Sequence, residues 1–489
     1  MLYIGVDLGT SAVKLLLMEE SGTIRRVVSR KYPVLYPQPG WSEQRPEDWY
    51  RETVAGIREL VLEEERSRVA GISFGGQMHG LVVLDEQDQV LRPAILWNDG
   101  RTAKETDWLN QSVGQEKLSQ YTANIAFAGF TAPKLLWMQN NEPELFAKIA
   151  KIMLPKDYLV YRFTGVHATE PSDAAGMLLF DVRNKCWSAE MLEICGVRPE
   201  QMPKIYESAQ VVGTLLPEMA AALQLSETVR VAAGAGDNAA AAVGTGTVGE
   251  GACNISVGTS GTLFITSRQF SVDPKNALHS FAHADGGYHL MGCILSAASC
   301  QQWWMERIMD SDDYASAQSS VDAALLGKNH VFFAPYLMGE RSPHNDTQVR
   351  GAFVGLTPET TRAEMQLAIW EGVAFAIRDC LEVARASGIV VKESKICGGG
   401  AKNALWRAIF ANVLNVDISR VETEEGPGLG AAMLAAVACG AYSSVEEAAE
   451  KIVQVKDTVH PTAELVARYE ERYQVYRKLY PVLHQLGQV

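Results

Sequence analysis

The sequence predicts an α/β protein of two large domains, each built on a mixed sheet with helices on its faces. The chain has 489 residues, which is more than one hydrophobic core usually serves. Strand-like and helix-like apolar patterns alternate after residue 46. A hairpin with a Gly-Thr-Ser turn occurs near residue 10 and again near residue 259, which indicates two related halves.

The composition is that of an ordinary globular protein, with 47% hydrophobic and 21% charged residues. A formal net charge of -14 argues against nucleic acid or an anionic membrane as the main partner, because those surfaces require clustered Lys and Arg. The eight cysteines are scattered and form no C-x-x-C pair, as expected for reduced thiols in the cytoplasm. Asp7 interrupts the first apolar stretch, so no signal peptide is predicted. The small-residue run 428–441 is shorter than the roughly 20 apolar residues that a membrane span needs.

The chain opens with a predicted antiparallel meander. Apolar and β-branched residues predict strands over 2–6, 13–18 and 24–28, separated by turns of Gly, Ser and Thr. A helix is expected after Pro46, where apolar residues recur at helical spacing up to residue 61, followed by a strand over 69–74. Because the start is a meander and not a βαβ unit, a dinucleotide-binding fold is disfavoured.

The hairpin pattern of the first residues recurs in the second half, with strands expected over 253–257 and 262–265. The glycine-rich stretch 244–251 before this hairpin is interpreted as a hinge. We therefore expect domains at 1–245 and 246–489. Later in the chain, a strand over 395–397 precedes three glycines and an amphipathic helix.

Both hairpin turns are candidate phosphate sites, because glycine lets the backbone approach an anion and hydroxyls can donate to phosphate oxygens. The first strand also carries Asp7 to the lip of its turn, where a carboxylate can hold a hydrated Mg²⁺ ion. Either turn alone is equally well an ordinary hairpin, and the pairing of the two favours a polyphosphate ligand. The candidate phosphate residues are Gly9, Thr10, Ser11, Lys14, Gly258, Thr259 and Ser260.

Two further segments suggest a nucleotide site and a general base. The strand-to-helix junction Gly398-Gly399-Gly400-Ala401 suits close approach by a nucleotide, and its spacing disfavours a nicotinamide cofactor. A plain helix-start loop is the alternative. Asp237 precedes a run of alanines and is expected at a helix N-terminus, where the dipole favours the ionised carboxylate that a base requires. A simple N-cap is the alternative there.

Polar residues also follow two predicted strands, at positions where ligands tend to bind. Gln77-Met78-His79-Gly80 follows the strand ending at residue 74, and Trp97-Asn98-Asp99 follows an apolar run. His79 and Asp99 offer hydrogen bonds to hydroxyls, and Trp97 offers a flat apolar face, although an aromatic residue there is more often part of the core. His279 and His283 have the spacing of a helical metal pair, but no third ligand is evident and no metal is expected at these two histidines.

Taken in order, these segments resemble the FGGY family of carbohydrate kinases nearly end to end. Residues 129–141 resemble the first signature of the family and residues 351–371 the second. The resemblance implies two ribonuclease H-like domains, the superfold of actin, hexokinase and the Hsp70 ATPase, around a central cleft. It also implies ATP, Mg²⁺ and a small sugar as ligands. One departure is Ala235, where a third glycine is expected, and its small side chain gives the difference little weight.

Within the family, five segments are similar to bacterial members that phosphorylate D-xylulose. These segments are 76–80, 95–101, 154–159, 172–176 and 335–341. Glycerol-specific members have Gln-Arg-Glu in place of Gln77-Met78-His79, so glycerol is disfavoured. Members acting on gluconate share the Met-His pair, and gluconate is therefore the nearest rival. Alternatives of another class are a non-kinase ATPase of the same superfold, a nicotinamide-dependent dehydrogenase and an inactive sugar-binding regulator.

The resemblance further implies roles for individual residues. Asp7 would organise Mg²⁺ through water, and Asp237 would act as the general base. The implied sugar contacts are Gln77, Met78, His79, Trp97, Asp99, Asp237 and Asn238. The implied nucleotide contacts, beyond the two phosphate turns, are Gly399, Gly400, Ala401 and Asn403. The oligomeric state stays open, with a homodimer as one alternative.

Overall fold

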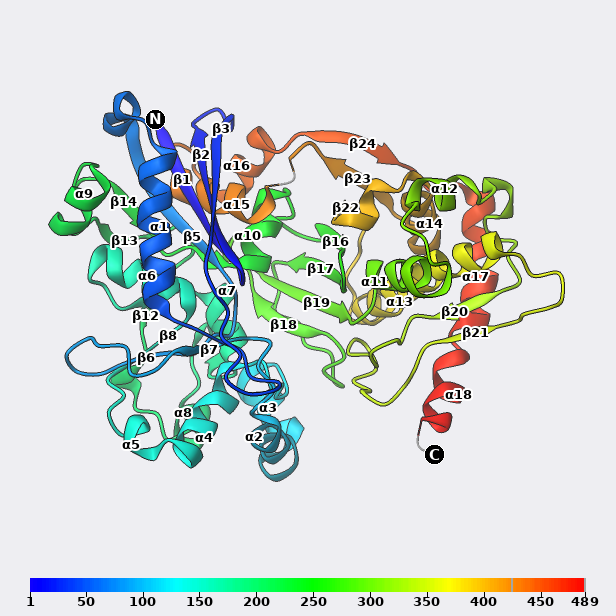
Figure 1. Ribbon diagram of the computed structural model, residues 1–489, viewed down its shortest axis with the longest axis horizontal. Coiled ribbons are helices and arrows are strands. Elements are labelled where there is room, and N and C mark those ends of the chain that lie inside the picture. Colours follow the sequence, from blue (N-terminus) through cyan, green and yellow to red (C-terminus); the bar gives the residue numbers. More distant parts are fainter. Residues whose placement is uncertain (424, 488–489) are drawn as a thin grey trace.

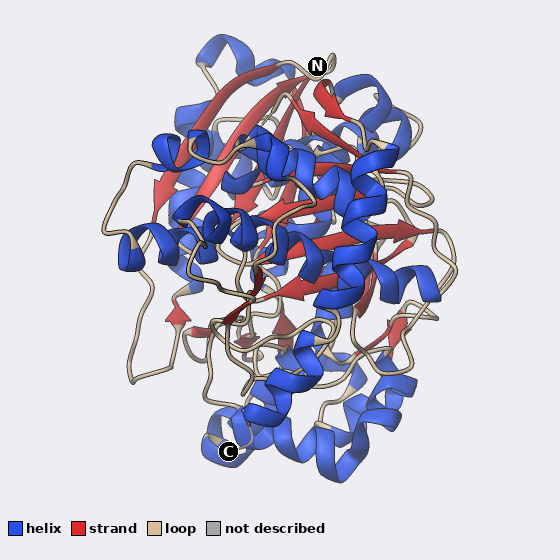
Figure 2. Cartoon of the chain, turned by 90° about the vertical axis from the view of Figure 1, so that its right-hand side faces the viewer, coloured by secondary structure: helices blue, strands red, loops and turns tan. Residues whose placement is uncertain are grey.

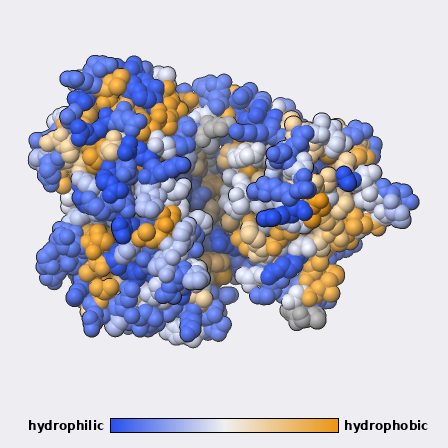
Figure 3. All heavy atoms as spheres, viewed as in Figure 1, coloured by the Kyte–Doolittle hydropathy of each residue, from blue (hydrophilic) through white to orange (hydrophobic). Residues whose placement is uncertain are grey.

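The computed structural model describes residues 1–423 and 425–487 and forms two lobes (Figure 1). A groove separates the lobes on the face shown in Figure 3. Each lobe is built on a seven-stranded sheet. The strands of the first sheet, in spatial order, are β13 (Val211–Thr214), β14 (Arg230–Ala232), β5 (Val69–Gly76), β1 (Leu2–Leu8), β2 (Ala12–Glu19) and β3 (Ile24–Lys31), and β15 (Ala235–Gly236) also pairs with β5.

The second sheet repeats the plan of the first. Its strands, in spatial order, are β18 (His279–Ala282), β19 (Tyr288–Ile294), β17 (Gly261–Ser267), β16 (Cys253–Val257), β22 (Glu393–Cys397), β23 (Asp417–Val421) and β24 (Val455–Val459). In each sheet a central strand, β1 or β16, has antiparallel neighbours on one side and parallel ones on the other. The internal repeat expected from the two hairpins is therefore present in the topology.

Helices cover both faces of the sheets, as the side view in Figure 2 shows. In the first half they are α1 (Pro46–Leu60), α2 (Ala103–Trp108), α3 (Gln115–Thr122), α4 (Thr131–Asn141), α5 (Pro143–Phe146), α6 (Pro155–Thr164), α7 (Pro171–Ala174), α8 (Ala189–Ile194), α9 (Pro217–Leu223) and α10 (Asp237–Gly244). In the second half they are α11 (Ala298–Trp303), α12 (Tyr314–Ser319), α13 (Arg362–Ala386), α14 (Ala404–Leu414), α15 (Gly426–Ala438), α16 (Val445–Ile452), α17 (Ala463–Tyr476) and α18 (Leu479–Leu486). Short two-stranded sheets complete the fold: β4 (Glu43–Gln44) with β7 (Ala94–Ile95), β6 (Val82–Leu84) with β8 (Lys151–Met153), β9 (Ala168–Thr169) with β12 (Lys204–Ile205), β10 (Phe180–Asp181) with β11 (Cys186–Trp187), and β20 (Phe332–Ala334) with β21 (Ala352–Val354).

Strand β1 is buried on both faces, which explains its nearly unbroken apolar sequence. One face packs into the core of the first lobe with Trp49 and Ile57 of α1. Helix α1 starts with a proline at its first turn and carries Glu47 and Asp48 there, as the helix dipole favours. The other face of the sheet is covered by α15, which comes from the second half of the chain.

Helices α10 and α15 cross at very short range and join the two halves. A Cβ atom on Gly244 would lie under 3.0 Å from the carbonyl oxygen of Gly426, and one on Gly430 would approach the carbonyl oxygen of Ala240 as closely. Only glycine permits this backbone contact. The small-residue run 428–441 is thus explained by helix packing, and no helix within residues 1–423 and 425–487 has the length and hydropathy of a membrane span.

Substitution at this crossing is expected to destabilise the fold. Gly430→Ala places a methyl group against a main-chain oxygen that cannot move aside, and such overpacking costs about 1–3 kcal/mol or more. Gly428→Ala is the matched control, because its Cβ would lie 3.6 Å from Leu16, in ordinary contact. Thermal unfolding should give a lower Tm for Gly430→Ala alone. Equal Tm values for the two variants would contradict the tight crossing.

The strands and helices predicted from the sequence are found in the structure, with small differences at their ends. The expected strands 2–6, 13–18 and 24–28 lie inside β1, β2 and β3, and 253–257 coincides with β16. The helix pattern up to residue 61 overshoots by one residue, because Val61 is an extended C-cap. His279 lies in strand β18 and not in a helix. Among the residues that the structure describes, no three His, Cys, Asp or Glu side chains are grouped to hold a metal ion.

Candidate active site

The two predicted carboxylates, Asp7 and Asp237, lie at the same edge of the first sheet. Asp7 of β1 is level with Gly75 of β5, which in turn is level with Ala235 of β15. Asp237 follows two residues later as the first residue of α10. Burial is the main cause that raises the pKa of Asp7 to about 6 and that of Asp237 to about 7. The charge of Asp7 adds to the rise at Asp237, so the two carboxylates are electrostatic neighbours.

Asp237 is held at the start of α10 beside two predicted sugar contacts. Its Oδ1 accepts a hydrogen bond of 2.7 Å from the backbone N–H of Asn238. The side-chain amide of Asn238 lies 3.7 Å from the sulfur of Met78, to which it donates. A Cβ on Gly236 would meet Met78 at 3.0 Å, so the methionine packs directly on the turn that carries the carboxylate. The structure therefore brings Met78, Asp237 and Asn238 together.

His79 is positioned as a neutral hydrogen-bond acceptor. Its Nδ1 lies 2.7 Å from the carbonyl oxygen of Gly176, and its ring stacks on Phe130 at 4.7 Å. Burial is the main cause that lowers the pKa of His79 to about 3, so the ring is neutral at physiological pH. A carbonyl oxygen can only accept, so Nδ1 carries the proton and Nε2 is left with a lone pair. Such a nitrogen can accept a hydrogen bond from a hydroxyl.

Trp97 and Gln77 lie close to the first hairpin turn. Trp97 is 46% exposed, and its Nε1 donates a 3.0 Å hydrogen bond to the hydroxyl of Thr10. Gln77 is buried and donates from its amide to Gln44 at 2.9 Å, while its own amide oxygen has no partner. The exposed indole face and the unpartnered oxygen are both suited to contact a ligand.

Asp99 is engaged in a structural ion pair. One oxygen accepts from the backbone N–H of Ser42 at 2.6 Å, and both oxygens accept from the guanidinium of Arg101 at 2.7 and 2.8 Å. Arg101 in turn lies 3.7 Å over the ring of Trp41. Since both oxygens are already occupied by protein donors, the geometry favours a role for Asp99 in fixing the loop after β7 over direct contact with a sugar hydroxyl.

The first hairpin turn has the compact geometry expected of it. The N–H of Gly9 donates to the carbonyl of Ala12 at 3.1 Å, and Ser11 at the tip is exposed. Lys14 does not extend freely toward a ligand. It is 40% exposed and forms a 3.0 Å ion pair with Glu425, at the start of α15. The cation predicted to approach phosphate thus links the hairpin to the second half of the chain.

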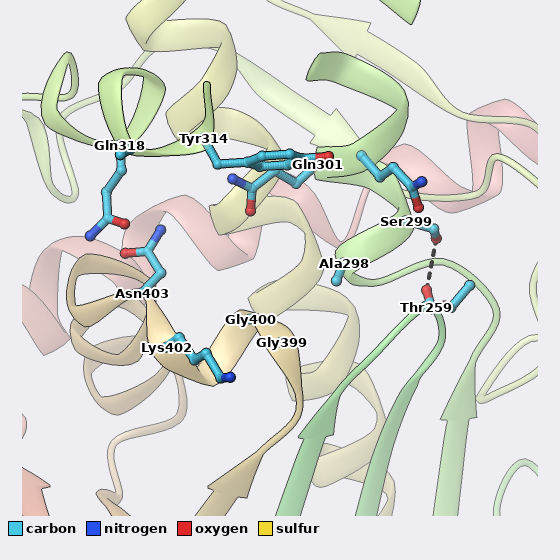
Figure 4. A pocket seen from close by; sticks show the side chains of 12 residues that line it. Thr259, Ala298, Ser299, Gln301, Tyr314, Gln318, Gly399, Gly400, Lys402 and Asn403 are labelled. Carbon is cyan, nitrogen blue, oxygen red and sulfur yellow. Dashed lines mark hydrogen bonds between the residues drawn. The ribbon is translucent and has the colours of Figure 1, made fainter. Parts of the chain in front are cut away.

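The second hairpin turn forms one wall of a cavity of about 470 Å³ in the second lobe (Figure 4). The N–H of Gly258 donates to the carbonyl of Ser260 at 3.1 Å, and the Ser299 hydroxyl donates to the carbonyl of Thr259 at 2.7 Å. The cavity is lined by Thr259, Ala298, Ser299, Gln301, Gln302, Tyr314, Ala315, Gln318, Gly399, Gly400, Lys402 and Asn403.

The glycine turn Gly399–Lys402 is a short 3₁₀ helix between β22 and α14. Asn403 caps α14 by accepting from the N–H of Trp406 at 3.1 Å, and its Nδ2 is buried without a partner. Figure 4 shows this amide facing Gln318 across the cavity. Ala401 lines a second cavity of about 370 Å³, which shares Gly399 with the first. The turn therefore separates two adjoining hollows.

Several lining residues of the first cavity carried no signal in the sequence. Gln301 of α11 faces Tyr314 and Gln318 of α12, as Figure 4 shows. These residues belong to no motif of recognised spacing. They reach the glycine turn only because α11 and α12 fold over the second sheet. A sequence pattern alone could not have identified them.

Comparison with known proteins defines the class to which this site belongs. The family model "FGGY family of carbohydrate kinases, N-terminal domain" matches residues 2–244, and the corresponding C-terminal domain model matches residues 253–439. The chain therefore belongs to the FGGY family of carbohydrate kinases. This confirms the predicted family, the carbohydrate kinase activity and the two-domain fold of the actin and hexokinase type.

Particular relatives are similar over almost the whole chain. The xylulose kinase of Escherichia coli (strain K12) is 42% identical over 484 residues, which cover 99% of each chain. The crystal structure of a xylulose kinase from Brucella ovis has a TM-score of 0.94 and 40% identity, covering 99% of this chain and 100% of that one. A gluconate kinase structure from Lactobacillus acidophilus has a TM-score of 0.92 and 27% identity, with coverage of 98% and 97%.

Proposed function

We propose that this carbohydrate kinase transfers the terminal phosphoryl group of ATP to D-xylulose, giving D-xylulose 5-phosphate. The observation that carries the proposal is the carboxylate of Asp237 beside Met78 and Asn238, with a pKa raised by burial to about 7. A base for an alcohol works best when its pKa lies near the working pH. The relatives named above support xylulose as the acceptor.

In the proposed mechanism the protein positions the reactants and manages charge. As the sugar oxygen, taken as that on C5, attacks the γ-phosphorus, its proton passes to the Asp237 carboxylate. The bond from the γ-phosphorus to the bridging oxygen breaks, and ADP leaves. His79 would accept from another sugar hydroxyl through Nε2, and Trp97 would cover the C–H face. Because phosphoryl transfer has a loose transition state, most of the catalysis is expected to come from alignment and electrostatics.

The nucleotide is proposed to bind along the two hairpin turns and the glycine turn. Gly9, Thr10 and Ser11 would face the phosphates from one lobe and Gly258, Thr259 and Ser260 from the other. The buried and unpartnered amide of Asn403 offers a donor to a nucleotide in the 470 Å³ cavity. Asp7 would hold Mg²⁺ through water, and the ion would neutralise phosphate charge. Burial raises the pKa of Asp7 to about 6 because it disfavours the ionised carboxylate, and a bound cation would stabilise that ionised form.

Gluconate is the second candidate acceptor, supported by the similar gluconate kinase structure at 27% identity. A panel of D-xylulose, D-ribulose, gluconate and glycerol should be compared in a coupled assay of ADP release with Mg²⁺ and ATP. We expect the highest kcat/KM with D-xylulose and only slow ADP release without sugar. A higher kcat/KM with gluconate would overturn the proposed acceptor, and sugar-independent ADP release at the full rate would overturn the kinase mechanism.

A substitution in the glycine turn should separate nucleotide binding from sugar binding. A Cβ atom on Gly399 would meet no other atom within 4 Å, and the residue lines both cavities, so Gly399→Val is expected to fill the nucleotide site while the fold persists. The KM for ATP should rise by about 10-fold or more, since 1.4 kcal/mol of lost binding corresponds to a factor of ten. The KM for D-xylulose should change little. A parallel rise in both values would contradict this assignment.

The described cysteines are all unpaired, in keeping with a protein of the cytoplasm. The domain boundary at 245/246 stays a prediction, as does a homodimer.

A further inference from the structure

A fully buried charge cluster lies beneath the turn that carries Asp237. The ammonium group of Lys156, the second residue of α6, has no solvent exposure and lies 2.6 Å from Asp157. It also lies 3.6 Å from Glu170 and 3.8 Å from Asp173. Burying one cation and three carboxyl groups is expensive unless each has a use or a partner. The mechanism proposed above uses none of them.

Glu170 organises the cluster by accepting hydrogen bonds from two serine hydroxyls. The Ser172 hydroxyl donates to Glu170 Oε1 at 3.0 Å, and the Ser208 hydroxyl donates to Oε2 at 2.8 Å. Backbone N–H groups of Ser172 and Asp173 also donate to the carboxylate, which caps α7. Both serines are buried. The two hydroxyls are therefore chemically matched, with the same acceptor and similar burial.

Only one of these serines touches the turn of Asp237 through its side chain. The backbone N–H of Gly236, the residue before Asp237, donates to the Ser172 hydroxyl at 3.1 Å. A hydroxyl has a single proton, and that of Ser172 is directed to Glu170, so its lone pair faces Gly236. The Ser208 hydroxyl has no contact of this kind among the described residues, and only its carbonyl accepts, from Gly234 at 3.0 Å. Ser172 is thus the side-chain link between the buried cluster and β15.

The same cluster supports the segment that precedes Met78 and His79. A Cβ on Gly76 would lie 2.8 Å from the Cβ of Lys156, so the start of α6 packs directly on the end of β5. Both oxygens of Asp173 are buried without a hydrogen-bond partner, and burial raises the pKa of this carboxyl well above its usual range. Asp157 and Glu170 lie closer to the Lys156 ammonium group than Asp173 does, and Glu170 orients Ser172.

We propose that Ser172 is a positioning residue for Asp237: its hydroxyl, oriented by Glu170, fixes the peptide of Gly236 and thereby aims the carboxylate at the sugar hydroxyl. The inference rests on the proposed function, in which Asp237 is the base. Misplacing a catalytic group by about 1 Å can cost on the order of 10²-fold in rate. Loss of the Ser172 hydroxyl should therefore displace the Asp237 carboxylate and lower kcat, while sugar binding, measured as KM, should change much less.

The test compares Ser172→Ala with the matched control Ser208→Ala in the full-length protein. Both variants remove a buried hydroxyl that donates to Glu170, so both should lower Tm, and Ser172→Ala should lower it more because it removes a second hydrogen bond. Only Ser172→Ala leaves the Gly236 N–H without its acceptor. We expect its kcat with D-xylulose to fall by about 10-fold while KM stays within about threefold. Ser208→Ala should keep kcat within about twofold.

Ser172→Cys provides a second variant if the alanine variant is insoluble, because it keeps the shape and weakens the acceptor. The inference would be overturned if the kcat of Ser172→Ala or of Ser172→Cys equalled that of Ser208→Ala. This holds whether the compared values stay normal or fall together. Asp237→Asn measured in parallel separates the two levels. If Asp237→Asn is active, the general-base role of Asp237 fails and the positioning role fails with it; if it is inactive while Ser172 variants are normal, only the positioning role fails.

Discussion

Replacing Asp237 by Asn is expected to lower kcat with D-xylulose by about 10²- to 10⁴-fold, the usual contribution of a general base. The amide keeps the shape of the side chain and the contact with the Asn238 N–H, but it cannot take the proton of the sugar hydroxyl. The KM for D-xylulose should stay within a few-fold. Steady-state kinetics with ADP detection measure both values.

Asp322→Asn is a suitable control for that experiment. Asp322 also accepts a backbone N–H at a helix start, from Ala324 at 2.9 Å, and it lines neither cavity of the second lobe. This variant should keep the activity of the parent enzyme. If Asp237→Asn retained comparable turnover, Asp237 would be a helix-terminal residue of the same structural kind, and the proposed mechanism would be wrong.

The second large effect concerns pH. Burial and the charge of Asp7 raise the pKa of Asp237 to about 7, and the base acts only when ionised. Consequently kcat/KM should be level above about pH 8 and fall roughly tenfold per pH unit well below 7, reaching about 1% near pH 5. The profile reports the coupled pair of carboxylates, because Asp7 titrates nearby with a pKa of about 6. A flat profile from pH 5 to 8 would exclude this assignment.

The stability of the substrate-free protein should also depend on pH through the titration of Asp237. The folded-state pKa of Asp237 lies above that of an unfolded chain, so the folded protein binds the proton more tightly. Its contribution to stability is therefore present below about pH 4 and is lost as pH rises through about 7. The Tm of Asp237→Asn should exceed that of the parent at pH 8 and match it near pH 4. The ionised Asp237 carboxylate lowers stability but is required for activity, which is a common trade-off at active sites.

Much of the fold could be predicted from local patterns. The two hairpins have glycine-containing turns between apolar strands, and such signals lie within short stretches of sequence. The C-terminal end of α1 could not be predicted to the residue, because Val61 continues the apolar spacing although its backbone is extended. The role of the 428–441 run depends on α10, almost two hundred residues earlier, and no local pattern contains that information.

The site was predictable where its chemistry resides in turns and strand ends. Asp7 lies near the end of β1 and Asp237 directly follows β15, and both strands run parallel to β5, which brings their ends together. The partners of Asp99 and Lys14 could not be inferred, because an ion pair depends on side-chain geometry as much as on composition. Lys156 and Ser172 fall in segments that resemble the family and Glu170 falls just before one, yet only the structure shows that they form one buried cluster.

The glycine crossing of α10 and α15 has a consequence for dissecting the enzyme. The N-terminal portion cut at the boundary 245/246 would lack α15, and the apolar face of β1 and β5 would meet water. Such a fragment should aggregate when expressed alone and recover solubility on coexpression with the remainder. We therefore expect the two lobes to fold as one cooperative unit, in which neither half is stable without the other.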